Sequence, residues 1–206
     1  MPRSLQTGSV FIQATEDYCL GIEMLIKLWS QVADTIITTW LINKKHIDVA
    51  GNFNTAFTIL EDSEFLCRIL KQNMPIKFTP RGASYYRQNV AGSVTKSISL
   101  PKLKTHLQVY KTIASYFTHM YDKNDIRQGL AYMFLHRFFW AYGINRYVGL
   151  QYIDEALKLE KNGLIAEQRF YGKKMEMVKQ LVGLKACLVL EYYYRRFNRK
   201  KNHHAF

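Results

Sequence analysis

The sequence predicts an all-α protein of five or six helices, with a long basic loop between the second and third helices. Apolar residues recur every three or four positions along most of the 206 residues, which is the spacing of one helix face. Hydrophobic residues make up 48% of the chain and aromatic residues 14%, so we expect a packed core rather than a disordered chain. The length suits one domain, and we predict a single domain over residues 1–206.

The first two helices are predicted before residue 73. Residues 16–43 carry apolar side chains at helical spacing, with polar residues on the opposite side. A second helix is predicted from about Asn54, whose side chain can cap free amides, to Gln72, because Pro75 prevents its continuation. We expect its acidic residues on a solvated face: Glu61, Asp62 and Glu64.

Residues 73–100 show no helical period and are predicted to form a long loop or extended arm. This segment holds two prolines and two glycines, and it is rich in serine and threonine. Loops longer than about 12–15 residues are uncommon in compact domains and are usually functional. We therefore treat this segment as a candidate functional element.

Helix resumes near Pro101, with Ser99 as its predicted cap. The core face of this helix is predicted to consist of Leu103, Leu107, Tyr110, Ala114 and Phe117. Residues 126–142 are apolar on nearly every side, so we predict that they form the central helix of the bundle, capped by Asn124 or Asp125.

Two helices are predicted after this one. The first runs from Asn145 to Lys161 and ends at an Asn-Gly pair suited to a helix end. The second covers residues 164–200, with bends expected at Gly172 and Gly183 because glycine weakens a helix interior. A basic tail is predicted over residues 198–206.

The charge lies in blocks and indicates an anionic partner. The chain carries a net charge of +13, from 29 Lys and Arg against 16 Asp and Glu. Residues 65–121 have a net charge of +9 with no acidic residue, and residues 169–206 have a net charge of +8. Residues 1–64 are net acidic and residues 122–168 are neutral. The two basic blocks are therefore the candidate surfaces for nucleic acid, an acidic protein or a lipid surface.

Cysteine usage and hydropathy predict an intracellular protein in a reducing compartment. The three cysteines, Cys19, Cys67 and Cys187, are far apart and lie among apolar residues, which favours buried free thiols over disulfides. We expect no secretory signal, because the first fifteen residues lack a long apolar run. No transmembrane segment is predicted, since the longest apolar stretch is interrupted by Asp34 and is shorter than the roughly 20 residues that span a bilayer.

Enzymatic chemistry is disfavoured by the motifs. The sequence has no phosphate-binding glycine loop, dinucleotide fingerprint, zinc-protease motif or nucleophile elbow. Ser93 and Lys96 match the Ser-x-x-Lys spacing of some acyl-transfer enzymes, but in a predicted loop. The six histidines do not cluster with other ligands, and His136 is interpreted as a core residue. We predict no catalytic residues, no metal, no cofactor and no small-molecule substrate; a small enzyme with a pocket around His136 or Ser93 is the least favoured alternative.

The strongest functional signal is the pairing of cations with aromatic rings. Lysine and arginine displace counterions from phosphates, and aromatic rings stack on unpaired bases. We predict nucleic-acid contacts from both blocks, at Lys77, Arg81, Tyr85, Tyr86, Arg87, Lys96, Lys102, Lys104, Lys111, Arg195, Arg196, Arg199, Lys200 and Lys201. An alternative interpretation is that the C-terminal tyrosines complete the core and the cations only solubilise the tail.

These observations favour a non-enzymatic structural subunit of a large nucleoprotein assembly. It would bind RNA or DNA backbone without sequence specificity, beside other protein subunits, through the basic arm and the basic C-terminal helix. The alternative is an accessory helical subunit of a multi-protein organellar or membrane-associated complex, whose excess charge would face lipid or acidic neighbours.

Overall fold

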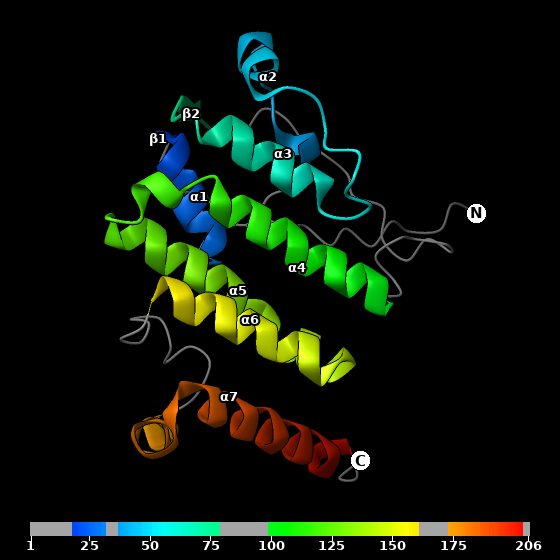
Figure 1. Ribbon diagram of the computed structural model, residues 1–206. Helices are drawn as coiled ribbons and strands as arrows, with labels where there is room; N and C mark the ends of the chain where they lie inside the picture. Colours follow the sequence, from blue (N-terminus) through cyan, green and yellow to red (C-terminus); the bar gives the residue numbers. More distant parts are fainter. Residues whose placement is uncertain (1–17, 32–36, 79–98, 161–172, 204–206) are drawn as a thin grey trace, which may run out of the picture. The chain divides into compact units, whose positions relative to one another are not determined.

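A computed structural model describes residues 18–31, 37–78, 99–160 and 173–203; for residues 18, 173–177, 180 and 198–203 only the backbone is described. Within these ranges the chain forms seven α-helices and one two-stranded sheet (Figure 1), which confirms a mostly helical protein. The chain divides into two compact units, Met1–Met120 and Tyr121–Phe206, and each is described by itself. The prediction of one domain stays a prediction.

The first unit combines helices with a short sheet. The strands β1 (Tyr18–Leu20) and β2 (Pro75–Lys77) pair antiparallel, with Cys19 opposite Ile76. The Gly21 amide also donates to the Met74 carbonyl at 2.9 Å. The helices are α1 (Gly21–Trp29), α2 (Lys44–Ala50), α3 (Glu61–Leu70) and α4 (Leu100–Ser115), with short 3₁₀ turns at Ile37–Thr39 and Thr118–Met120.

The prediction of one helix over residues 16–43 is wrong. Residues 18–20 form a strand, and α1 begins at Gly21, where the Glu23 carboxylate accepts the Leu20 amide at 2.8 Å. The helix ends at Trp29, because Gln31 has the left-handed φ of 56°. The apolar spacing continues to Trp40, but residues 37–39 form a 3₁₀ turn instead of an α-helix.

The second predicted helix begins seven residues too early. Helix α3 begins at Glu61, after Leu60 in the left-handed conformation, so the helix cannot continue backwards from there. The Asn54 side chain accepts the Ala56 amide at 3.0 Å and therefore closes a turn rather than capping the helix. Strand β2 interrupts the loop predicted over 73–100, and residues 79–98 of that loop lie outside the described residues.

The core of the first unit is formed by α1, α3 and α4. The Trp29 and Phe117 rings meet edge to face with centroids 5.0 Å apart. The core face predicted for α4 is confirmed, since all five of its residues are buried. The predicted cap is also confirmed: the Ser99 hydroxyl accepts the Lys102 amide at 3.5 Å.

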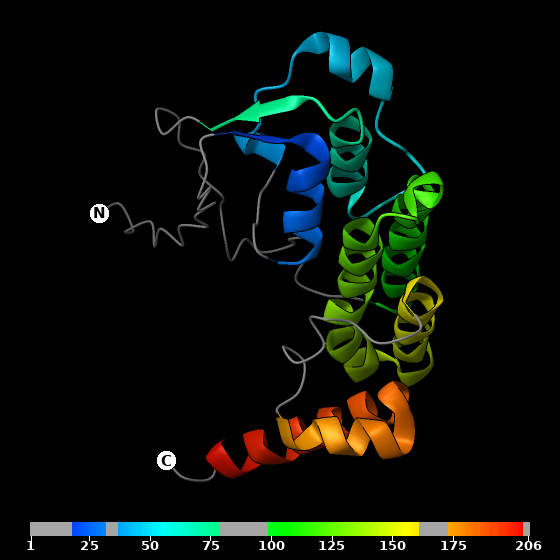
Figure 2. The same ribbon diagram turned by 90° about the vertical axis from the view of Figure 1, so that its left-hand side faces the viewer.

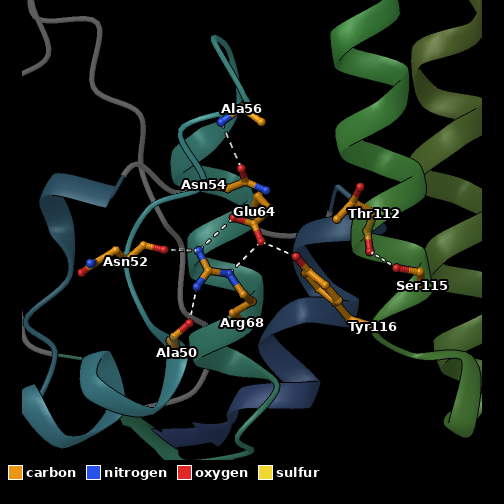
Figure 3. Close-up of polar contacts among 9 residues, drawn as sticks. All are labelled: Ala50, Asn52, Asn54, Ala56, Glu64, Arg68, Thr112, Ser115 and Tyr116. Atoms are coloured by element: carbon orange, nitrogen blue, oxygen red, sulfur yellow. Dashed lines mark hydrogen bonds and ion pairs between the residues drawn. The ribbon is translucent and has the colours of Figure 1, made fainter.

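Glu64 is a further correction in this unit, because it is buried rather than solvated. Its side chain is 1% exposed, and it pairs with Arg68 at 2.7 Å between Oε1 and Nε (Figure 3). The Tyr116 hydroxyl donates to the same oxygen. Arg68 also donates to the carbonyls of Ala50 and Asn52. This partly buried network, centred on the buried Glu64, joins α3, the residue after α4, the end of α2 and the chain that follows α2.

The second unit contains an antiparallel pair of helices, α5 (Asn124–Ile144) and α6 (Arg146–Leu159), which run side by side (Figure 2). Arg127 near the start of α5 pairs with Glu160 after α6 at 3.3 Å. At the other end Gly149 approaches Tyr142 so closely that an added Cβ would lie 2.5 Å from the Tyr142 Cα. Residues 126–142, which were predicted to form the central helix, are helical and mostly buried.

The helix starts in this unit differ in their capping. The Asn145 side chain accepts the Val148 amide at 3.0 Å and caps α6, at the residue where the sequence predicted the helix to begin. The prediction that Asn124 or Asp125 caps α5 is wrong: both residues already lie in the helix, and its N-cap is Lys123, which has no side-chain cap bond.

The last helix, α7 (Lys173–His203), bends at Gly183, which has φ 79° and ψ 164°. Figure 1 shows its two segments running in different directions. This bend was predicted; Gly172 and the Asn162-Gly163 pair lie outside the described residues, and so does the tail beyond residue 203. The three cysteines are buried thiols outside any disulfide, as predicted. None of the helices in the described ranges is long and apolar enough to cross a membrane.

Candidate nucleic-acid interface

The structure describes about half of the predicted contact residues with their side chains. Lys77, Lys102, Lys104 and Lys111 belong to the first unit, and Arg195 and Arg196 belong to α7 in the second. Arg199, Lys200 and Lys201 lie on the α7 backbone without described side chains. Five residues lie outside the described ranges: Arg81, Tyr85, Tyr86, Arg87 and Lys96. The predicted convergence of the two blocks is a relation between units and stays a prediction.

Helix α4 presents a polar face that we call the α4 lysine face, formed by Lys104, Gln108, Lys111 and Ser115. All four residues are exposed, and each follows the previous one by three or four positions. Their spacing places them on one side of the helix, opposite the buried residues. Lys104 and Lys111 are about 10 Å apart along the helix axis. This face is thus a row of two cations and two hydrogen-bonding side chains.

The positive charge near the start of α4 is not explained by helix stability. Lys102 and Lys104 lie in the first turns, where the helix dipole is positive and favours acidic residues. A cation there costs a few tenths of a kcal/mol up to about 1 kcal/mol relative to a favourable charge. The same charge strengthens the attraction of this end for an anion, so the lysines fit a binding role better than a stabilising one.

The buried network fixes the other end of this face. Tyr116 directly follows α4 and donates to Glu64 on α3. Burial and, second to it, the hydrogen bond to Glu64 raise the pKa of the Tyr116 phenol to about 12, so the hydroxyl stays a donor at neutral pH. The exposed Lys71 lies with its ammonium 5.6 Å from the centroid of the Tyr116 ring. A further cation is thereby held beside the end of α4.

The second unit carries another group of cations and rings, which we call the aromatic–arginine surface. It consists of Arg146 and Tyr147 on α6 and Tyr193, Tyr194 and Phe197 on α7. The Arg146 guanidinium lies 5.7 Å from the centroid of the Tyr193 ring. Three of the rings are largely open to solvent: Tyr147 is 73% exposed, Tyr194 63% and Phe197 59%. Such exposure is unusual for rings that only complete a core.

The neighbouring residues of α7 show which side of this helix is packed. The Tyr192 ring meets Tyr142 on α5 at 4.9 Å between centroids, and Leu188 is 1% exposed. At 100° per residue, Tyr194 and Phe197 lie on the side of the helix opposite Leu188 and Tyr192. Tyr192 therefore serves the packing of the unit, whereas Tyr194 and Phe197 face away from it.

Arg195 and Arg196 have different surroundings although they are adjacent. Arg195 pairs with the buried carboxylate of Glu191 at 2.7 Å, and its guanidinium lies 4.6 Å from the Phe139 ring centroid. Arg196 is exposed and donates from its Nη1 to the Tyr192 hydroxyl at 3.4 Å. Arg195 is thus used in packing, whereas Arg196 is an exposed cation beside Tyr192, on the side of α7 away from Tyr194.

Sequence reasoning missed Arg146 and Tyr147, because they lie in the block with no net charge. The available signal was local: an arginine and a tyrosine directly follow the cap Asn145, so both begin a helix at an exposed end. The proximity of Arg146 to Tyr193 depends on the packing of α7 and is not visible in the sequence.

Other chemistry-bearing groups show structural surroundings. His136 is half-buried, and its ring stacks on Tyr132. Its pKa is lowered mainly by burial and, to a smaller extent, by the positive charge of Arg137. Burial raises the pKa of the Cys67 thiol to about 12, which keeps it protonated and unreactive. Within the described ranges no three His, Cys, Asp or Glu side chains come together as metal ligands. Ser93 and Lys96 lie outside those ranges.

Comparison with known proteins adds no functional information. No protein-family model, no curated protein and no solved structure matches the chain significantly.

Proposed function

We propose that the protein is a non-enzymatic structural subunit of a nucleoprotein assembly, and that it binds nucleic-acid backbone without sequence specificity. The α4 lysine face and the aromatic–arginine surface supply the contacts, and other subunits of the assembly are expected as neighbours. Binding of this kind depends on counterion release and needs no base-reading motif.

The α4 lysine face is the observation that carries the proposal. It belongs to a stretch of 57 residues, 65–121, that contains nine basic residues and no carboxylate. Its lysines are exposed and lie on one side of a helix whose opposite side is anchored in the core. An ordinary solvated helix face mixes both charge signs, which limits self-repulsion. A row of one sign on a rigid element is typical of a surface that meets an anion.

A second candidate function is that of an accessory subunit in a multi-protein or membrane-associated complex. It is favoured by exposed aliphatic side chains on α7, where Leu181 is 85% exposed and Val182 and Leu190 are about half exposed. Side chains of this kind become buried when a partner chain covers them. In this case the cations would pair with carboxylates of a neighbour or with acidic lipid.

The test is the salt dependence of binding by the full chain. We would measure Kd for single- and double-stranded RNA and DNA of mixed sequence between 50 and 300 mM salt. The expected result is sequence-independent binding that weakens steeply as salt rises, with a logarithmic slope of about 0.9 per phosphate neutralised on duplex DNA. Absent binding, or a flat response to salt, would rule the proposal out.

A pair of double variants locates the contact. Lys104→Gln with Lys111→Gln removes two charges from the α4 lysine face and should reduce the slope on duplex DNA by about 1.8, because two phosphate contacts are lost. The matched control, Lys44→Gln with Lys45→Gln, removes the same charge from exposed positions on α2, where Asp48 already pairs with Lys44. The control should leave the slope unchanged; equal effects of both variants would show that only net charge matters.

A further inference from the structure

The exposed rings of the second unit are not accounted for by backbone binding alone. Lysine and arginine suffice to neutralise phosphates, and a polar surface would keep them soluble. Tyr194 and Phe197 instead leave more than half of their area in water on the face of α7 that points away from its own packing. An occupant that covers aromatic faces would give this exposure a purpose.

The charges around these rings restrict the occupant to an anion. The charged member of the aromatic–arginine surface is Arg146, which lies over Tyr193, about one turn before Phe197 on the same side of α7. The nearest acidic residue of α7, Glu191, is buried and paired with Arg195, so its charge is compensated within the unit. An apolar protein partner would have to bury Arg146 without a countercharge, which is costly.

The geometry also favours flat groups over aliphatic chains. The Arg146 guanidinium already lies over the Tyr193 ring, which shows that this ring presents its face to a planar cation. Tyr194 and Phe197 are separated by about 4.5 Å along the helix axis, so their rings occupy successive positions on one side of α7. Rings beside arginines combine base stacking with phosphate contact, the two contacts that a nucleotide offers together.

A duplex cannot use such a surface, because its base faces are covered by neighbouring base pairs. Only unpaired nucleotides expose base faces, and stacking on them contributes several-fold in affinity per base without regard to sequence. From these observations we infer that the aromatic–arginine surface binds single-stranded nucleic acid in preference to a duplex, with bases on Tyr194 and Phe197 and phosphate at Arg146. The inference rests on the proposed function and specifies its ligand.

The test compares strands of equal length on the full chain. Tyr194→Leu with Phe197→Leu keeps apolar side chains but removes both rings, and it should weaken binding of single-stranded 20-mers about fivefold to 100-fold. Duplex binding, which depends on lysine and arginine contacts, should change less than twofold. The control Leu181→Ala removes an exposed apolar side chain from α7 before its bend and should leave both affinities unchanged.

A second variant gives a direct reading of stacking. Phe197→Trp keeps an aromatic face at the same position, so single-strand affinity should be retained. The fluorescence of the new indole should be quenched as a single strand saturates the protein, and it should remain unquenched with duplex. A Phe197→Trp protein whose emission does not change with single strands would overturn the inference.

The outcomes separate the two levels of the proposal. If the leucine variant weakens single strands and duplexes equally, the preference for unpaired bases is refuted while salt-dependent backbone binding stands. If neither nucleic acid binds, the proposed function fails.

A third set of measurements uses vesicles of phosphatidylserine and phosphatidylcholine. The inference is refuted if the leucine variant loses vesicle binding while its affinity for single strands is unchanged, because the rings would then contact a lipid surface.

Discussion

Replacing Glu64 with glutamine tests the buried network that positions the α4 lysine face. The substitution keeps the shape of the side chain but removes the charge that faces Arg68. The amide also offers only one acceptor oxygen where the carboxylate accepts from the Arg68 guanidinium and from the Tyr116 hydroxyl. At least one donor of the network is then left facing another donor, in a place from which water is largely excluded.

The expected loss in free energy of unfolding is about 3 kcal/mol. Removing one partner of a buried ion pair costs about 3–5 kcal/mol because a charge remains uncompensated. The lower end applies here, since Arg68 is 18% exposed and still donates to the carbonyls of Ala50 and Asn52. Tyr116→Phe removes one hydrogen bond to a carboxylate that keeps its arginine, so its cost should be smaller, about 1.5 kcal/mol.

The assay is urea denaturation followed by tryptophan fluorescence. In a Trp140→Phe background the remaining tryptophans, Trp29 and Trp40, both report on the first unit. With a slope of about 2 kcal/mol per molar urea, the Glu64→Gln midpoint should fall by about 1.5 M.

A double variant isolates the pair itself. Glu64→Leu with Arg68→Met replaces both charges by apolar groups and should be more stable than Glu64→Gln, because no buried charge remains unpaired. The reasoning is refuted if Glu64→Gln costs less than 1 kcal/mol, or if the double variant is the less stable of the two.

Two further predictions concern the second unit. Gly149→Ala should lower Tm, because the added Cβ would meet the Tyr142 backbone at 2.5 Å and force α5 and α6 apart, at a cost of about 1–3 kcal/mol. Gly143→Ala is the control. Its Cβ would contact the Tyr192 side chain at 3.4 Å, so this variant should not lower Tm. The pKa of His136 is lowered by burial and by Arg137, so the folded state binds its proton less readily than the unfolded state does. The neutral His136 therefore contributes to the free energy of unfolding above about pH 6.5, the ordinary pKa of histidine in the unfolded chain. This contribution is lost as the pH falls through the lowered pKa that His136 has in the folded protein. Thermal unfolding between pH 7.5 and 5 should therefore show a smaller acid-induced loss in His136→Gln than in the parent; identical pH profiles would contradict this.

The elements predicted best are those whose limits are set by local chemistry. Asn145 caps α6 through its own side chain, and Gly183 bends α7 through its own backbone freedom. Both signals act within a few residues, so the sequence shows them directly. The start of α4 at Ser99 belongs to the same group.

The elements predicted worst depend on distant partners. Residues 18–20 form a strand because they pair with residues 75–77, and the apolar period that follows them gives no sign of this pairing. Leu60 is left-handed although it is an unfavourable residue for that conformation, and only the packed structure imposes it. Glu64 looked solvated because acidic neighbours precede it, whereas its burial is determined by Arg68 one turn later and by Tyr116 on another element.

The candidate surfaces show the same division between local and distant causes. The α4 lysine face follows from helical spacing alone, so the exposed positions of Lys104 and Lys111 could be derived from the sequence. Charge counting treats Arg195 and Arg196 as equivalent, yet a rotation of 100° between them places one on the buried Glu191 and the other at the exposed edge. A cation that compensates a buried carboxylate is held by the fold, whereas an exposed cation such as Arg196 can be reached by a ligand. The charge of a block therefore indicates the sign of a partner, and only the packing of each side chain indicates which charges the partner can reach.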